Sequence, residues 1–442
     1  MVTLVDHVLL YAVGVVLFVV GVALSIGLHE FGHLVPGKLF NVKVTQYFIG
    51  FGKTLWSTRR GETEYGVKAI PLGGYVKLVG MLPPVEGELG AAGEEVAARP
   101  TGMFAQLVSD AKRAEYEHVD PADHDRLFYR QSVWKRIVIM VSGVATNLVL
   151  AFILFAIAFM GIGVNGPSTT IGSVSVCVKV VNAAKPGVCG PKDPKTPAYA
   201  AGLRQGDRVL SFAGHKITSY AQLQDLVRAG NAEHTTIVVD RGGRQLTLPI
   251  DPVVNSMPSL TSASKNVNVG FIGITSATQP QRESVGYVLS TMVDETNATL
   301  SALAHLPSRV YHVGRAALGL EKRDPNSLMS VVGAGRVAGE VASTNDASVT
   351  RKLTGLILLL GGLNLFLGLV NLVPLPPFDG AGVATALVEA ARSRWARLRG
   401  RPDPGVIDAG KLLPLTYAMA ALLLMISVVL IYADIVAPVS IS

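Results

Sequence analysis

Charged residues are scarce in this sequence. Asp, Glu, Lys and Arg make up 16% of its 442 residues, whereas 49% are hydrophobic and the mean hydropathy is positive. Such a composition excludes an ordinary soluble domain and places the chain in a membrane. The first seven residues lack a basic region, and no small-residue cleavage site follows the first apolar stretch. We therefore expect that this stretch is a membrane span and not a cleaved signal peptide.

Other absences narrow the function. The chain has no internal repeat and no nucleic-acid recognition fold, and its basic clusters lack stacking aromatic residues, which excludes nucleic acid as a partner. The net charge of +7 comes instead from lysines and arginines next to apolar stretches, so it indicates membrane orientation. By the positive-inside tendency, segments 38–136 and 381–411 face the cytoplasm, and the long segment 165–350 lies outside.

Four apolar stretches meet or nearly meet the length of about 20 residues needed to cross a bilayer as a helix. They are Val8–Leu28, Ile137–Val164, Leu353–Val373 and Leu412–Ala433. We predict a mainly α-helical membrane protein. Its segments are transmembrane helices at 1–36, 133–164, 352–380 and 412–434, a β-hairpin at 42–81, loops at 82–132 and 381–411, a β-rich module at 168–277, and an amphipathic helical segment at 282–350.

Alternation of apolar and polar residues with interspersed glycines predicts short strands directly after the first span. Bare strand edges are not tolerated in lipid, so a hairpin there must sit within protein or line a cavity. The module at 168–277 is predicted to contain a strand, a short helix with Leu223, Leu226 and Val227 on one face, and a hairpin that turns at Gly242-Gly243.

Only two cysteines are present, Cys177 and Cys189, and both fall in the segment expected outside. An oxidising compartment would permit a disulfide that closes a short structural loop, although two unrelated thiols are also compatible with the sequence.

The sequence "HEFGH" lies at residues 29–33, near the end of the first span. Histidines at positions i and i+4 share one helix face, so His29 and His33 can bind one Zn²⁺ with Glu30 beside the metal. Catalytic zinc has three protein ligands and one open position, so a third ligand is expected elsewhere. We predict Asp379, because it follows the third span at matched depth and an acidic residue at such depth is a functional candidate. Other histidines are poor candidates, in acidic or outside segments: His118, His124, His215, His234, His305 and His312.

These residues resemble a known family. "FIGFG" at 48–52, "GGYVKLVGM" at 73–81, "WKRIVIMVSGVATN" at 134–147, "AGLRQGDRVLSFAG" at 201–214 and "NLVPLPPFDG" at 371–380 follow "HEFGH" in the order found in site-2 proteases. The chain is similar in particular to bacterial members with an extracytoplasmic PDZ module. The resemblance implies a re-entrant β-hairpin on the cytoplasmic side at 42–81 and one PDZ-like domain at 168–277.

The resemblance also implies residue roles. His29, His33 and Asp379 would bind one catalytic zinc, and Glu30 would be the general acid and base. Asn147 and Asn371 would hold the substrate backbone or the developing oxyanion, or else join helices within the bundle. Further site residues implied are Gly73, Gly74 and Tyr75 at a substrate-holding hairpin edge, and Gly202 and Leu203 at the PDZ groove.

The function implied is zinc-dependent intramembrane endopeptidase activity in the inner or plasma membrane, with the active site towards the cytoplasm. Substrates would be single-span membrane proteins such as anti-sigma factors, with remnant signal peptides a further class. An upstream site-1 type protease would trim their ectodomains first. The alternative from another class is a non-proteolytic zinc-binding membrane sensor or a PDZ scaffold, which would have no need of Glu30.

Overall fold

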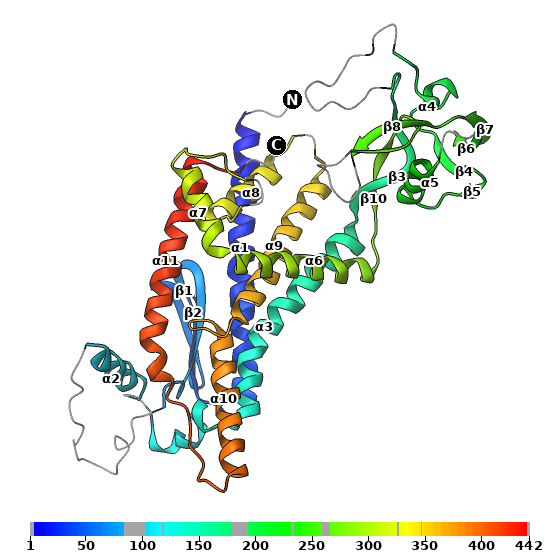
Figure 1. Cartoon of the computed structure of the whole chain (residues 1–442). Helices are drawn as coiled ribbons and strands as arrows, with labels where there is room; N and C mark the ends of the chain where they lie inside the picture. Colours follow the sequence, from blue (N-terminus) through cyan, green and yellow to red (C-terminus); the bar gives the residue numbers. More distant parts are fainter. Residues whose placement is uncertain are drawn as a thin grey trace. The chain divides into compact units, whose positions relative to one another are not determined.

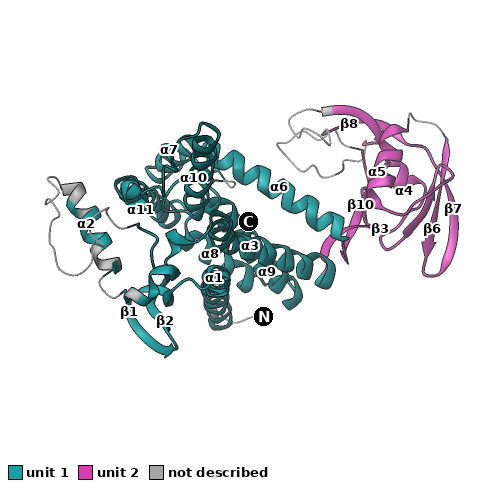
Figure 2. Cartoon of the chain, turned by 90° about the horizontal axis from the view of Figure 1, so that it is seen from below, with its two compact units in different colours: residues 1–162, 284–442 teal, residues 163–283 magenta. Residues whose placement is uncertain are grey.

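The computed structural model describes residues 4–83, 103–116, 119–178, 189, 193–230, 234–258, 266–324, 327–345 and 347–439. Two compact units make up the chain (Figure 2). One comprises Met1–Ile162 and Ser284–Ser442, and the other comprises Gly163–Glu283. The first unit is mainly helical and the second is mainly β-sheet.

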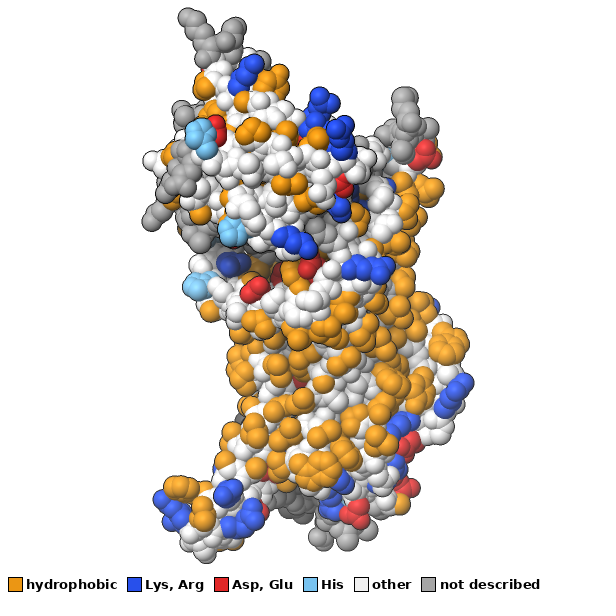
Figure 3. Space-filling view, turned by 90° about the vertical axis from the view of Figure 1, so that its right-hand side faces the viewer, with side chains coloured by type: hydrophobic (Ala, Val, Ile, Leu, Met, Phe, Trp, Pro, Cys, Tyr) orange, Lys and Arg blue, Asp and Glu red, His pale blue; other side chains and the backbone are white. Residues whose placement is uncertain are grey.

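Four helices of the first unit are long and apolar enough to cross a membrane: α1 (Leu4–Leu39), α3 (Val133–Ala156, continued by a π-helical turn at Ile157–Ile162), α9 (Val349–Asn371) and α11 (Leu413–Val436) (Figure 1). Hydrophobic side chains cover much of the face of these helices that Figure 3 shows. The prediction of a multi-pass membrane protein with four spans is confirmed.

Small residues let these helices approach closely, as is usual in membranes, where packing replaces the hydrophobic effect between helices. An added Cβ at Gly32 of α1 would lie 2.5 Å from Thr146 Oγ1 of α3, and one at Gly361 of α9 would lie 2.9 Å from the Phe155 ring of α3. The α3 helix therefore contacts both α1 and α9, and it forms the centre of the bundle.

The hairpin after α1 differs from the predicted short strands. It consists of two long strands, β1 (Val44–Arg60) and β2 (Thr63–Leu78), and both bend. In the register, residues 46–49 lie opposite both 64–67 and 74–77, because the hairpin folds back on itself. Gly50, with φ of +92°, and Gly73, with φ of +122°, adopt backbone conformations that other residues rarely adopt. Sequence alternation detects the strands but cannot show that a strand continues through such a bend.

Helices also form in segments that the sequence predicted as loops. Segment 82–132 contains α2 (Met103–Tyr116) and two 3₁₀ turns, Pro121–Arg126 and Phe128–Arg130. The basic segment 381–411 lies in α10 (Asp379–Leu398) for more than half of its length, followed by a 3₁₀ turn at Ala409–Leu412. Its alanine, leucine, glutamate and arginine residues are good helix formers, and this propensity outweighs the charge that had predicted a loop.

The amphipathic segment before α9 forms three helices, α6 (Val285–Ala304), α7 (Leu306–Ala317) and α8 (Val331–Ser343). Asp434 of α11 is buried and fixes the C-terminal end of that helix to this region. It accepts hydrogen bonds from Arg323 at 2.6 Å and from the Ser330 amide at 2.7 Å. A buried carboxylate with these partners is satisfied and serves to hold the helices together.

The second unit is built on a sheet of strand order β10-β3-β4-β6-β7, with β5 paired to β4 and a separate β8–β9 pair. The elements are β3 (Val164–Val174), α4 (Pro197–Ala200), β4 (Arg208–Phe212), β5 (His215–Lys216), α5 (Tyr220–Ala229), β6 (Thr235–Arg241), β7 (Arg244–Ile250), β8 (Val253–Pro258), β9 (Asn266–Phe271) and β10 (Ile274–Gln281).

The core of this unit lies between α5 and the sheet. Leu223 and Val227 of α5 are buried there, and Leu226 packs against the same cluster. The β6–β7 hairpin turns at Gly242 and Gly243, whose φ values of +61° and +87° suit a tight turn. Cys177 and Cys189 are joined by a disulfide.

Candidate metal centre

Two histidines of α1 face into the helical unit. His29 and His33 lie one turn apart and are 8% and 4% exposed. Their Nε2 atoms approach to 3.2 Å. Because the two rings share one helix face, both nitrogens can reach a single ion.

Asp379 completes a triangle with these nitrogens. The chain leaves α9 at Asn371, turns through a proline-rich stretch, and enters α10 at Asp379. The Asp379 Oδ2 atom lies 3.2 Å from Nε2 of His29 and 3.2 Å from Nε2 of His33. Within the described part of the chain, these three residues form the group of side chains that could hold a metal ion. The sequence prediction of Asp379 as the third member agrees with this placement.

The donor set fits zinc. A point about 2 Å from all three atoms exists beside their plane, and about 2 Å is the length of zinc bonds to imidazole nitrogen and carboxylate oxygen. The Asp379 Oδ2 atom is buried and has no hydrogen-bond partner among the described residues. Three lone-pair-bearing atoms so close together repel one another unless a cation lies between them. Two histidines and one carboxylate leave a fourth tetrahedral position open, which is the arrangement of catalytic zinc.

The other ring nitrogens contact α3. The Nδ1 atom of His33 lies 2.7 Å from the Ile139 carbonyl oxygen, which can only accept a hydrogen bond. Nδ1 therefore carries the proton, and Nε2 keeps the lone pair that a metal needs. The Nδ1 atom of His29 lies 3.1 Å from the amide nitrogen of Asn147. Asn147, which the family resemblance placed at the substrate, thus contacts a histidine directly.

A glycine makes room for His33. A Cβ atom added at Gly143 of α3 would lie 2.2 Å from the His33 Nε2 atom, well inside any real contact. Gly143 and Ile139 were not among the residues predicted for the site. The "GVATN" motif contains Gly143 and Asn147 at helical spacing and was the available signal, whereas a backbone carbonyl leaves no trace in a sequence.

Glu30 lies between the histidines and the hairpin. Its carboxylate accepts a hydrogen bond from the backbone amide of Val76 in β2. A Cβ added at Gly74 would lie 3.1 Å from the Glu30 side chain, so the absence of a side chain lets the strand approach the helix. Tyr47 of β1 strengthens this contact, because its hydroxyl donates to the Gly27 carbonyl at 2.7 Å. The edge of β2 therefore runs beside Glu30.

The remaining predicted residues of the helical unit lie near this edge or at a helix end. Tyr75 stacks on Phe48, with ring centroids 5.7 Å apart, and its hydroxyl donates to Gln46. A Cβ at Gly73 would lie 2.2 Å from the Phe51 ring. Asn371 is the last residue of α9 and is half buried.

A buried ion pair links α3 to α10. Arg136 and Glu389 are 7% and 9% exposed, and both guanidinium nitrogens Nη1 and Nη2 contact the carboxylate. Because α10 begins at Asp379, this pair fixes the helix that carries the third candidate ligand. Nothing in the residues around Arg136 or Glu389 indicates that these two side chains pair.

Gly202 and Leu203 are not among the residues that line the pocket found in the described part of the β-rich unit. Leu203 is buried in the core cluster, and the Gly202 carbonyl accepts a hydrogen bond from Arg241. The pocket, of about 110 Å³, lies instead between α5 and the segment 270–274. Its lining includes Leu223 and Val227.

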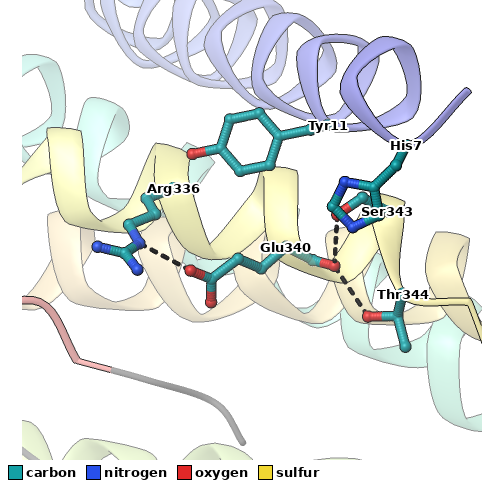
Figure 4. A pocket seen from close by; sticks show the side chains of 6 residues that line it. All are labelled: His7, Tyr11, Arg336, Glu340, Ser343 and Thr344. Atoms are coloured by element: carbon teal, nitrogen blue, oxygen red, sulfur yellow. Dashed lines mark hydrogen bonds and ion pairs between the residues drawn. The ribbon is translucent and has the colours of Figure 1, made fainter. Parts of the chain in front are cut away.

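A larger hollow of about 550 Å³ lies between α1 and α8 (Figure 4). Its lining residues are His7, Tyr11, Arg336, Glu340, Ser343 and Thr344. The charged pair there neutralises itself, because Arg336 Nε lies 2.7 Å from Glu340 Oε1. This hollow therefore offers no unpaired buried charge to a ligand, and it does not extend to the metal centre.

Comparison with known proteins agrees with this chemistry. A model of peptidase family M50 matches residues 17–402. The zinc metalloprotease Rip1 of Mycobacterium tuberculosis is 33% identical over 444 residues, which cover 98% of this chain and 99% of that protein. Rip1 of Mycolicibacterium smegmatis is 31% identical, over 98% of this chain and 100% of that protein. The metalloprotease MmpA of Caulobacter vibrioides is 30% identical, over 86% of this chain and 87% of that protein.

Proposed function

The chain belongs to peptidase family M50 and is a zinc-dependent metalloendopeptidase of the membrane; from this premise we propose that it cuts single-span membrane proteins inside the bilayer. The observation that carries the proposal is the triangle of His29, His33 and Asp379 beside Glu30. The two histidines and Glu30 lie on α1, a helix long and apolar enough to span the membrane. The site would face the cytoplasmic side, and the β-rich unit would lie outside.

Each residue then has a task. His29, His33 and Asp379 hold the zinc ion, which when bound lowers the pKa of water and polarises the scissile carbonyl. Glu30 accepts the proton of the attacking water and delivers it to the leaving amine. Asn371, at the end of α9, donates an amide hydrogen to the oxyanion as it develops.

The hairpin supplies a place for the substrate. Every interior carbonyl of a helical substrate is bonded to the amide four residues on, so the substrate unwinds locally before attack. The edge of β2 at 73–77 offers backbone groups to the unwound stretch by strand addition. Val76 in this edge contacts Glu30, so an added strand brings its scissile bond to the base.

This model predicts substrates with helix-weakening residues in their spans. Replacing those residues with leucine should abolish cleavage, because leucine favours the closed helix. The assay is cleavage of a purified single-span substrate whose ectodomain has been removed, with activity lost on zinc chelation and restored by added zinc. Equal cleavage of the leucine variant would contradict the unwinding step.

The β-rich unit is proposed to be a PDZ-like filter. It would admit substrates whose ectodomains a site-1 type protease has already trimmed. The physiological substrates would be membrane-anchored anti-sigma factors, and remnant signal peptides would be a further class. Its pocket beside α5, next to the edge strand β10, favours a second candidate role, the binding of a free C-terminus. Deletion of residues 170–276 separates the two. Loss of a filter permits cleavage of intact substrates, whereas loss of a recruiting site reduces cleavage of all substrates.

A further inference from the structure

One face of α3 carries three successive contacts to the histidines. Ile139, Gly143 and Asn147 are spaced by four residues and therefore lie on the same side of the helix. Ile139 accepts from His33, Gly143 leaves room for the His33 ring, and Asn147 contacts His29. Two of these contacts set the position of His33, so the question is what the third does for His29.

Burial of the Asn147 side chain is energetically unfavourable. It is 1% exposed, and its Oδ1 atom is buried without a hydrogen-bond partner in the described part of the chain. An unpaired buried polar atom costs about 1–3 kcal/mol. A leucine of similar volume would avoid this cost. The Oδ1 atom of Asn364 is also buried without a partner among the described residues, but the amide nitrogen of Asn364 donates to Ser25 and to the Leu360 carbonyl. The contact of the Asn147 amide is with His29, so that contact must account for an amide at this position.

The histidine explains it. If the Nε2 atom of His29 binds a metal, the proton resides on Nδ1 and needs an acceptor. The amide of Asn147 lies 3.1 Å from Nδ1. The two ends of an amide group have the same shape, so a half turn about its last bond brings the oxygen, which now lacks a partner, onto the Nδ1 proton. The backbone carbonyl of Ile139 does the same for His33.

We infer that Asn147 is a positioning residue for the zinc ligand His29. It fixes the tautomer and the ring orientation of His29, and it does not hold the oxyanion. Nδ1 and Nε2 lie on different sides of the imidazole ring, so an amide that bonds Nδ1 is turned away from the ligand triangle. The inference rests on the proposed zinc site of His29, His33 and Asp379.

The test compares zinc affinity among purified full-length variants in one detergent. Asn147→Leu removes the acceptor, Asn147→Asp keeps one, and Asn364→Leu is the matched control. Asn364 is also a fully buried asparagine in a span, but its amide donates to Ser25 at 2.9 Å and contacts no histidine. Competition with a chelator gives the dissociation constant of zinc, and the absorption spectrum of the Co²⁺-loaded proteins reports the ligand geometry.

We expect Asn147→Leu to weaken zinc binding by about 10–100-fold, the usual effect of losing a group that orients a metal ligand. Its Co²⁺ spectrum should change, whereas Asn147→Asp and Asn364→Leu should bind zinc and Co²⁺ as the wild type does. Equal loss in both leucine variants would overturn the inference, because helix packing would then be the cause.

Wild-type zinc affinity in Asn147→Leu, together with lost cleavage, would also overturn it and would assign the amide to the substrate. Failure of the proposed function looks different, because the wild type would then bind zinc without cutting any single-span substrate. In that case the zinc dissociation constants of the variants can still be compared, so the inference about Asn147 is still tested.

Discussion

Replacing Gly143 with alanine should remove zinc from the protein without altering a ligand. The new Cβ atom would lie 2.2 Å from Nε2, 2.6 Å from Cε1 and 2.8 Å from Cδ2 of His33. Ordinary contacts begin near 3.4 Å, so the ring must retreat by more than about 1 Å, whereas metal bonds tolerate about 0.2 Å. The ring cannot simply turn aside, because its Nδ1 atom is held by the Ile139 carbonyl on the same helix as Gly143.

The expected loss of zinc affinity exceeds the factor of about 10–100 that follows the loss of an orienting group. Zinc content and chelator competition measure it on purified protein. Gly362→Ala is the matched control, because it is also a glycine of a spanning helix and an added Cβ there meets nothing within 4 Å. Full zinc content in Gly143→Ala would refute the described placement of His33 against α3.

Two further predictions concern ion pairs. Arg136→Ala leaves Glu389 buried without its partner, which should lower the free energy of unfolding by about 3–5 kcal/mol. It should also lower zinc affinity, because the pair holds α10. In a double-mutant cycle, removing both charges with Arg136→Met and Glu389→Leu should destabilise the protein less than either single change. Burial alone raises the pKa of Asp207, but hydrogen bonds from Arg241 and from the Arg204 amide hold it below its usual value. This contribution to stability is present above the unfolded pKa of about 4 and is lost as the pH falls through the folded value. The thermal unfolding midpoint of the β-rich unit should therefore decrease as the pH is lowered from about 5 to about 3. The decrease should be smaller in Asp207→Asn than in the wild type.

Much of the helical unit could be predicted because its signals are local. The four spans follow from length and hydropathy, and the spacing of His29 and His33 fixes them on one helix face. Asp379 is distant from the two histidines in sequence, yet the predicted topology places it at the same depth in the membrane as their end of the first span. By contrast, the charge of segment 381–411 predicts a loop, although α10 forms there as far as Leu398.

The supporting contacts could not be predicted because they depend on which helix faces meet. Nothing local indicates that Arg136 pairs with Glu389, or that the Ile139 carbonyl orients His33. Asn147 shows the limit most clearly. A family motif places it at the site, but only the distance to His29 distinguishes a role in orienting a ligand from a role at the substrate.

The most direct test of the account compares wild type with Glu30→Gln in matched detergent, on a single-span substrate without its ectodomain, with the zinc content of both measured. Glutamine keeps the shape of Glu30 and removes its basicity, and it leaves the triangle of His29, His33 and Asp379 intact. We predict that both proteins hold zinc and that only the wild type cuts. Cleavage by Glu30→Gln at the wild-type rate would contradict the assignment of Glu30 as the base. Zinc in both proteins with cleavage by neither, on any such substrate, would instead favour a zinc-binding sensor.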